Sequence, residues 1–170
     1  MTPNPSPAPG LASLLYVEDE DNDVLFMRRA LDRAGLPLEF HTVCDGDKAV
    51  AFLSGEAPHA WRALPDLVLL DLNLPVRSGF EVLEWIRRHP APALCSRPVA
   101  VISSSGRHED RERARRLGAD DYIVKPTSPT QLLEILLALW ARWLSPEARM
   151  SIRRRPIPAT TVPAATNPAG

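Results

Sequence analysis

The chain has 170 residues, of which 45% are hydrophobic and 24% charged, with a formal net charge of −1. These values are normal for one soluble globular domain, and the near-neutral balance argues against general binding to nucleic acid or to a membrane surface. No apolar run approaches the roughly 20 residues of a membrane-spanning helix, and the N-terminus lacks the features of a signal peptide. Cys44 and Cys95 lie far apart without CxxC spacing, which favours free thiols. We therefore expect a cytoplasmic protein.

Both ends of the chain are low in complexity. Residues 1–10 and 156–170 alternate proline with small residues and offer little apolar surface to bury, so we predict that they are disordered. Residues 146–170 also hold four arginines against one glutamate. Such a cluster can bind nucleic acid, but no helix-turn-helix pattern accompanies it, and a solvated, disordered tail over 146–170 is the interpretation that we favour. The predicted folded domain is 11–145.

Within that domain, short apolar runs alternate with helical patterns. In chain order, the predicted elements are a strand at 14–17, a helix at 22–34, a weaker strand at 38–43, a helix at 46–54, a strand at 66–71, a helix at 78–88, a strand at 99–102, a helix at about 108–117, a strand at 122–124 and a helix from Ser128 to about Leu144. A longer loop at 55–65 precedes the third strand. Ser78 and Glu81 have the spacing of a capping box, Ser128-Pro129 suits a helix start, and Asp45 is a candidate cap.

Five such strand–helix units imply an α/β fold. Strands that are apolar on both faces are typical of a parallel sheet covered by helices on each side. Open sheets of this kind bind their ligands at the carboxyl ends of the strands. The functional residues are therefore expected at that edge.

The predicted strand ends carry a specific set of polar side chains. Glu18 and Asp19 follow the first strand, Asp71 ends the third, Ser103 ends the fourth, and Lys125 follows the fifth. Carboxylates this close cannot all stay ionised without a cation among them, and hard oxygen ligands suit Mg²⁺. A carboxylate can also attack a phosphoryl group to give an acyl phosphate. Asp71 is the candidate nucleophile because its strand is the most apolar, and so the most central.

The other groups of the set would then neutralise or bind the transferred phosphoryl group. The Lys125 ammonium would offset its charge, and the Ser103 hydroxyl would donate to one of its oxygens. Each residue alone has a structural alternative: Asp71 as a loop cap, Ser103 as a strand-ending hydroxyl, and Tyr122 as a half-buried strand aromatic. Glu20 and Asp23 we interpret only as solvated acids at a helix N-terminus.

Three stretches, 15–19, 69–75 with 78–80, and 118–126, resemble the receiver domains of two-component response regulators, and the resemblance covers about residues 12–144. It implies a flavodoxin-like (βα)5 sheet with strand order 2-1-3-4-5. It also implies a phosphoacceptor that is not a metabolic enzyme and that takes a phosphoryl group on Asp71 from a sensor histidine kinase. The signal would pass to another protein through the face around helix 108–117, strand 122–124 and the last helix.

The resemblance also assigns roles to single residues. Mg²⁺ would be bound by Asp19, Asp71 and the main-chain carbonyl of Asn73, with Glu18 acting through a water. Lys125 would contact the phosphoryl group, while Ser103 and Tyr122 would form a switch pair. Two features depart from the commonest pattern. Glu18 replaces an aspartate, and the run of three serines at 103–105 replaces a Thr-Ala pair; the strand register favours Ser103.

The form of residues 71–75, the loop at 55–65 and the Trp-rich last helix resemble the small regulators that are paired with bacterial phytochromes. A light-regulated histidine kinase is then the expected partner, and the downstream protein stays unknown.

The last helix carries two apolar stripes. The stripe expected to pack on the sheet comprises Leu132, Leu136, Leu139 and Trp143. The second stripe comprises Leu133, Leu137, Trp140 and Leu144. Because one helix of a single domain needs only one buried face, the second stripe favours a homodimer interface. Burial under the loop at 55–65 is the alternative.

Two other functions share part of this pattern. A phosphohydrolase of the haloacid-dehalogenase type also uses an aspartyl nucleophile with Mg²⁺, but it needs a second aspartate two residues later, where this chain has Asn73. A pseudo-receiver that only binds proteins would lack part of the acid set, which is complete here. A flavin-binding module is a further alternative, and its bound flavin would colour the purified protein.

Overall fold

Five parallel strands form one sheet in the order β2-β1-β3-β4-β5. The computed structural model describes residues 11–56 and 63–153. Its strands are β1 (Ala12–Val17), β2 (Leu38–Val43), β3 (Leu67–Leu70), β4 (Val99–Ser103) and β5 (Asp121–Val124). The predicted flavodoxin-like strand order is confirmed. The expected disorder of 1–10 and 156–170, and the middle of the loop at 55–65, lie outside the described residues.

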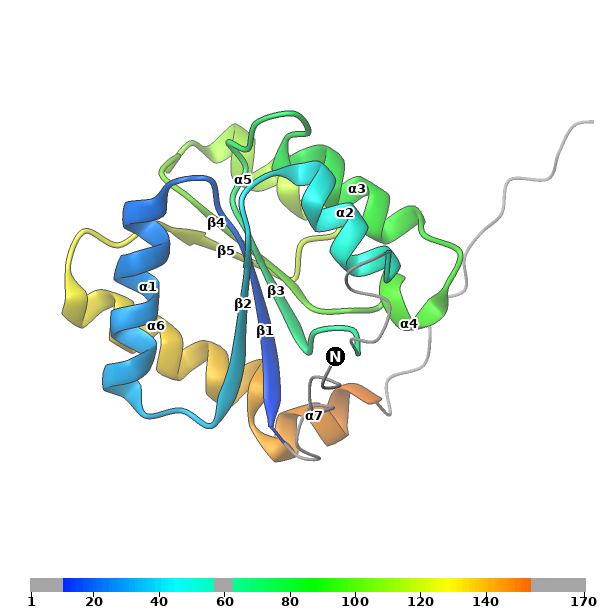
Figure 1. Cartoon of the computed structure of the whole chain (residues 1–170). Helices are drawn as coiled ribbons and strands as arrows, with labels where there is room; N and C mark the ends of the chain where they lie inside the picture. Colours follow the sequence, from blue (N-terminus) through cyan, green and yellow to red (C-terminus); the bar gives the residue numbers. More distant parts are fainter. Residues whose placement is uncertain (1–10, 57–62, 154–170) are drawn as a thin grey trace, which may run out of the picture.

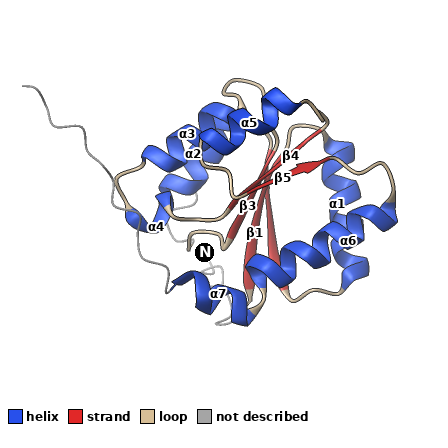
Figure 2. Cartoon of the chain, turned by 180° about the vertical axis from the view of Figure 1, so that it is seen from behind, coloured by secondary structure: helices blue, strands red, loops and turns tan. Residues whose placement is uncertain are grey.

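Helices cover both faces of this sheet. They are α1 (Asp21–Ala34), α2 (Gly46–Ser54), α3 (Gly79–Arg88), α4 (Pro92–Cys95), α5 (His108–Arg116), α6 (Pro129–Leu139), the π-helical turn η1 (Trp140–Leu144) and α7 (Pro146–Arg153). Figure 1 shows α1 and α6 on one face and α2, α3 and α5 on the other, and the opposite view in Figure 2 agrees. None of the described helices is both long and apolar enough to cross a bilayer.

The core consists of two apolar layers, one on each face of the sheet. All four residues of β3 are fully buried, and they alternate between the layers: Val68 and Leu70 pack towards α2 and α3, while Leu67 and Leu69 pack towards α1 and α6. The apolar run of this strand therefore reflects its central position between β1 and β4, as the sequence predicts.

Helix boundaries that depend on local hydrogen bonds agree with the sequence. The Asp45 carboxylate accepts from the main-chain N–H of Lys48 at 2.7 Å. Ser78 and Glu81 form both bonds of the predicted capping box, and the Ser128 hydroxyl accepts from the N–H of Gln131. These caps involve residues only three apart, so the sequence alone is enough to identify them. The short helix α4 was not predicted.

The predicted end of the domain at 145 is wrong, because α7 continues the fold. Ser145 begins this helix, with its hydroxyl accepting from the N–H of Ala148 at 3.2 Å. A guanidinium nitrogen of Arg149 donates to the carbonyl of Leu11 at 3.1 Å and lies 3.4 Å from a carboxylate oxygen of Asp66. Arg149 is therefore not part of a solvated tail. These partners are far away in sequence, so no local pattern reveals them.

The same helix changes the interpretation of the two stripes on the last helix. The first stripe, Leu132, Leu136, Leu139 and Trp143, is buried against the sheet as predicted. Leu144 of the second stripe is also buried, at 2% exposure, in a cluster on which Ile152 of α7 packs. Leu144 was therefore wrongly placed on a free dimer face. Leu137 is 46% exposed, and Leu133 and Trp140 are half-buried.

A half-buried arginine, Arg87, joins α3 to the segments before β4 and β5. The Arg87 guanidinium donates to Asp120 at 2.7 Å and to the carbonyls of Gly118, Cys95 and Arg97 at 2.8, 3.0 and 2.8 Å. The Asp120 carboxylate also accepts from the N–H of Val99 at 2.9 Å. Arg87 thus links α3, the residues after α4 and the loop before β5.

We expect Arg87→Ala to lower the free energy of unfolding by about 3 kcal/mol, because it leaves a partly buried carboxylate and three carbonyls without their donor. The adjacent Arg88 pairs with Glu84, and its side chain is 79% exposed, so Arg88→Ala should cost less than about 0.5 kcal/mol. Urea denaturation of both variants measures the difference. Equal losses for the two would contradict the role assigned to Arg87.

Candidate functional site

The site lies at the carboxyl ends of the strands. Main-chain hydrogen bonds between neighbouring strands continue past the strand ends and fix the residues of the site. The N–H of Asp71 donates to the carbonyl of Val17 at 3.1 Å, and the N–H of Lys125 donates to the carbonyl of Ser103 at 2.8 Å. Asp71 and Lys125 therefore stand at fixed main-chain positions on one edge, as predicted from the strand ends.

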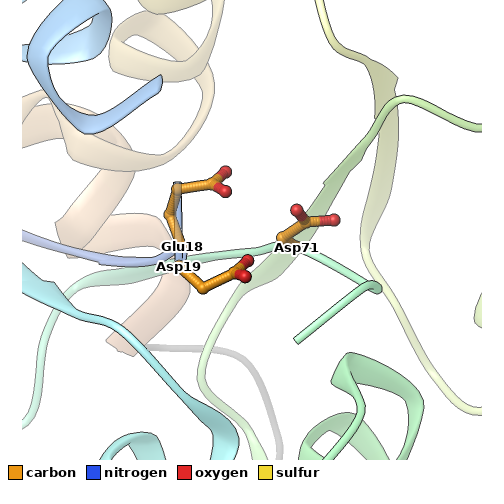
Figure 3. Close-up of side chains that lie close together, drawn as sticks. All are labelled: Glu18, Asp19 and Asp71. Carbon is orange, nitrogen blue, oxygen red and sulfur yellow. The ribbon is translucent and has the colours of Figure 1, made fainter. Parts of the chain in front are cut away.

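Three carboxylates meet at this edge, and Figure 3 shows them side by side. One oxygen each of Glu18, Asp19 and Asp71 lies within 4.8 Å of the others. Glu18 and Asp71 are buried, with 1% and 3% of their surface exposed, and Asp19 is the more accessible member. This oxygen set fits a hard divalent cation that keeps some of its waters. The predicted side-chain ligands are thus brought together.

A single ammonium group lies among the acids. Lys125 Nζ is 2.7 Å from Glu18 Oε2, 2.7 Å from Asp23 Oδ2 and 2.8 Å from Asp71 Oδ2. Burial alone lowers the pKa of Lys125, but its hydrogen bonds to the three carboxylates outweigh burial and raise the pKa above its ordinary value. Lys125 therefore stays charged, and it partly offsets the repulsion among these acids.

Glu18 is held on both carboxylate oxygens. Its Oε2 accepts from the Tyr16 hydroxyl at 2.6 Å as well as from Lys125, and its Oε1 accepts from the N–H of Glu20 at 3.2 Å. Burial raises the pKa of Glu18 above its ordinary value, and the bonds from Lys125 and Tyr16 oppose that effect only in part. Ionisation of Glu18 is therefore less favourable in the folded protein than in water.

Asp71 is placed by the loop that follows it. Its Oδ1 accepts from the N–H of Asn73 at 3.1 Å, and Asn73 itself is exposed. Gly79 begins α3 so close to this loop that a Cβ there would lie 2.0 Å from the Asp71 carbonyl oxygen. Exposed Val76 in the same loop has φ of +67°, a conformation that β-branched residues rarely adopt. The loop geometry is thus tightly constrained.

The predicted switch residues converge on the loop after β4. Ser103 is fully buried, and its Oγ accepts from the N–H of Ser105 at 3.2 Å. The hydroxyl of half-buried Tyr122 donates to the carbonyl of Ser105 at 2.8 Å. Ser104 is exposed to solvent. The main-chain N–H and carbonyl of Ser105 therefore connect Ser103 to Tyr122. This geometry favours Ser103 over Ser104 as the switch residue.

Two residues of the site were missed from the sequence. Asp23 was interpreted as a solvated acid at a helix start, but it is a direct partner of Lys125. Tyr16 was read only as part of a buried strand, but its hydroxyl contacts Glu18. The strand period offers one signal for Tyr16, because residues 16 and 18 project to the same face. No local sequence pattern indicates the bond between Asp23 and Lys125.

A family model described as the response regulator receiver domain matches residues 14–137. The chain belongs to the response regulator receiver family. Among known proteins, the phosphate regulon transcriptional regulatory protein PhoB of Rhizobium meliloti is 32% identical over 144 residues, covering 85% of this chain and 58% of PhoB. The receiver therefore spans little more than half the length of that relative.

The alignments with smaller regulators cover almost the whole length of those proteins. Response regulator Rcp1 of Synechocystis sp. is 30% identical over 131 residues, which are 77% of this receiver and 88% of Rcp1. The Mn²⁺-bound structure of Rcp1 aligns with a TM-score of 0.68 at 27% identity, over 87% of this chain and 99% of that one. The phosphorylated cyanobacterial phytochrome response regulator RcpA aligns with a TM-score of 0.73 at 37% identity, over 80% and 96%. The predicted resemblance to phytochrome-associated regulators is confirmed.

The raised pKa of Glu18 leads to a prediction for the cation-free receiver. The folded state binds the Glu18 proton more tightly than the unfolded chain does, so the ionised carboxylate destabilises the fold at any pH above the raised pKa. This penalty disappears as the pH falls through the ordinary value of 4.5. We therefore expect Glu18→Gln to melt at a higher temperature than wild type at pH 7 in EDTA. Below pH 4.5 the melting temperatures of the two proteins should become equal.

Calorimetry across this pH range checks the prediction. Glu112→Gln, on the outer surface of α5, is the control for loss of one negative charge and should show no such convergence. A lower melting temperature for Glu18→Gln at pH 7 would contradict the sign.

Proposed function

We propose that the protein is a Mg²⁺-dependent phosphoacceptor that takes a phosphoryl group on Asp71 from the phosphohistidine of a sensor kinase. The observation that carries this proposal is the meeting of Asp71 with Glu18, Asp19 and the Lys125 ammonium at one strand edge. Membership of the receiver family and the Mn²⁺-bound structure of Rcp1 support a divalent cation in this position.

The transfer needs a nucleophile and neutralisation of charge. A carboxylate oxygen of Asp71 forms a bond to phosphorus while the P–N bond of phosphohistidine breaks, and that electron pair stays on the imidazole, which takes up a proton. Asp19, Asp71 and the Asn73 main-chain carbonyl would bind Mg²⁺, with Glu18 acting through a water. When bound, the ion offsets charge on the phosphoryl oxygens. The Lys125 ammonium pairs with another of these oxygens.

Ser103 and Tyr122 would report the phosphorylated state to the surface. Ser103 Oγ accepts from Ser105, so its own hydrogen is free to donate to a phosphoryl oxygen. A movement of Ser103 would shift Ser105, whose carbonyl holds the Tyr122 hydroxyl. The change would then reach the face formed by α5, β5 and α6, where a downstream protein of unknown identity binds.

The similarity to RcpA favours a phytochrome-type, light-regulated histidine kinase as the donor. We propose a cytoplasmic location, which fits the two free cysteines. Hydrolysis would be no more than slow loss of the phosphoryl group, since exposed Asn73 stands where an aspartyl phosphohydrolase needs an acid. Nucleic acid and membranes are not expected partners.

Replacement of the nucleophile provides the direct test. We expect Asp71→Asn to abolish labelling by radioactive acetyl phosphate with Mg²⁺, because an amide cannot form the acyl phosphate, whereas exposed Asp32→Asn on α1 keeps it. EDTA should also remove wild-type labelling. Label that persists in Asp71→Asn, or a wild type that takes no label, would overturn the proposed function.

We also propose a homodimer through the outer face of α6. Leu133, Leu137 and Trp140 lie along one stripe at helical spacing, and Leu137 is 46% exposed. A partly exposed apolar stripe of this kind is typical of an interface, and a two-fold axis would bring the stripe against its own copy.

A charge at the centre of this stripe should separate the protomers. We expect light scattering to give a dimer for wild type and a mass of 18.8 kDa for Leu137→Glu. Leu25→Glu is a matched control, because Leu25 of α1 is equally exposed at 46%, and it should stay dimeric. A wild type of monomer mass would refute this interface.

A further inference from the structure

Tyr16 carries a hydroxyl into a layer that is otherwise apolar. The residue lies on β1, is 2% exposed and packs in the cluster that includes Leu14, Leu69 and Ile102. A phenylalanine would fill the same space without a polar atom to bury, and a buried hydroxyl is unfavourable unless it is bonded. The hydroxyl therefore needs an explanation other than packing.

Among the residues that the structure describes, that hydroxyl bonds to the carboxylate of Glu18. Tyr16 OH donates to Glu18 Oε2 at 2.6 Å. A tyrosine phenol is protonated throughout the physiological range, so Tyr16 is the donor of this bond. The bond is short and charge-assisted, which places it among the stronger hydrogen bonds of the fold.

The other side-chain donor to Glu18 has several partners. Lys125 Nζ contacts Oε2 at 2.7 Å but also contacts Asp23 and Asp71. In the proposed reaction this ammonium pairs with the incoming phosphoryl group, so its hold on Glu18 weakens. Within the described residues, the hydrogen bond of the Tyr16 hydroxyl goes to Glu18 and not to Asp71 or Lys125. Tyr16 is the side-chain donor that can hold Glu18 through the whole cycle.

The length of glutamate makes such an anchor useful. Glutamate has one more rotatable bond than aspartate, so a free Glu18 carboxylate loses more conformational entropy when it is fixed. The Tyr16 hydroxyl, which lies on the same face of the sheet as Glu18, restricts this rotation of the carboxylate.

We infer that Tyr16 is a positioning residue, whose hydroxyl holds the Glu18 carboxylate in the orientation that the divalent cation needs. The inference rests on the proposed function, since it matters only if this site binds the cation. Groups that hydrogen-bond to metal-binding carboxylates usually contribute about 10-fold or more to metal affinity.

Tyr16→Phe removes the hydroxyl and keeps the ring. We expect isothermal titration calorimetry with MgCl₂ to show about 10-fold weaker binding for this variant than for wild type. The loss should depend on the glutamate: in a Glu18→Asp background, where the carboxylate stands one methylene further from the hydroxyl, Tyr16→Phe should change the affinity by less than about 2-fold. Leu136→Val, in the same apolar layer, is the control for destabilisation alone and should bind as wild type does.

Unchanged Mg²⁺ affinity in folded Tyr16→Phe would overturn this inference and leave the phosphoacceptor proposal standing. An equal loss in the Glu18→Asp background would also overturn it, because Tyr16 would then act by another route. A wild type that neither binds Mg²⁺ nor takes label on Asp71 would remove both proposals.

A second measurement does not depend on the variant folding. In wild type, a bonded and buried phenol gives a slowly exchanging hydroxyl proton signal by NMR. We expect this signal of Tyr16, assigned by its contacts with Leu14 and Ile102, to persist when Mg²⁺ saturates the site. Its loss on Mg²⁺ addition would show that Tyr16 releases Glu18, and the inference would fail.

Discussion

The site depends on one ammonium group placed among carboxylates. Glu18 and Asp71 are almost completely buried, and two such charges without a counter-ion would be too costly to keep ionised. Lys125 reaches from the end of β5 to both of them and to Asp23 on α1. It thereby ties together the ends of three strands and the first turn of a helix. The remaining excess of negative charge is of the kind that a divalent cation would offset.

The alternation of side chains along the strands separates Tyr16 and Lys125 from Tyr122. Tyr16 and Ile123 belong to the layer under α1 and α6, whereas Tyr122 packs in the layer under α2, α3 and α5. Lys125 and Tyr122 are three residues apart and so leave β5 on opposite faces. Lys125 therefore lies on one side of the sheet, and Tyr122, with its bond to Ser105, lies on the other.

The opposite edge of the sheet is closed by α7, whose Arg149 binds the start of β1 and Asp66 before β3. This closure buries Leu144 and reduces the apolar stripe of α6 to its middle part. The proposed dimer interface then involves the residues around Leu137.

The sequence by itself determined the elements and the family. Strands such as 67–70 are read from continuous apolar runs, and the caps at Ser78 and Ser128 from residues three apart, because these signals are local. The same applies to Glu18, Asp19, Asp71 and Lys125, since parallel strands must bring their carboxyl ends to one edge. Only the tertiary structure decided which polar atoms face each other across that edge. Asp23 with Lys125, Tyr16 with Glu18, and Arg149 with Asp66 depend on side-chain direction and on contacts between distant segments, which no local pattern encodes.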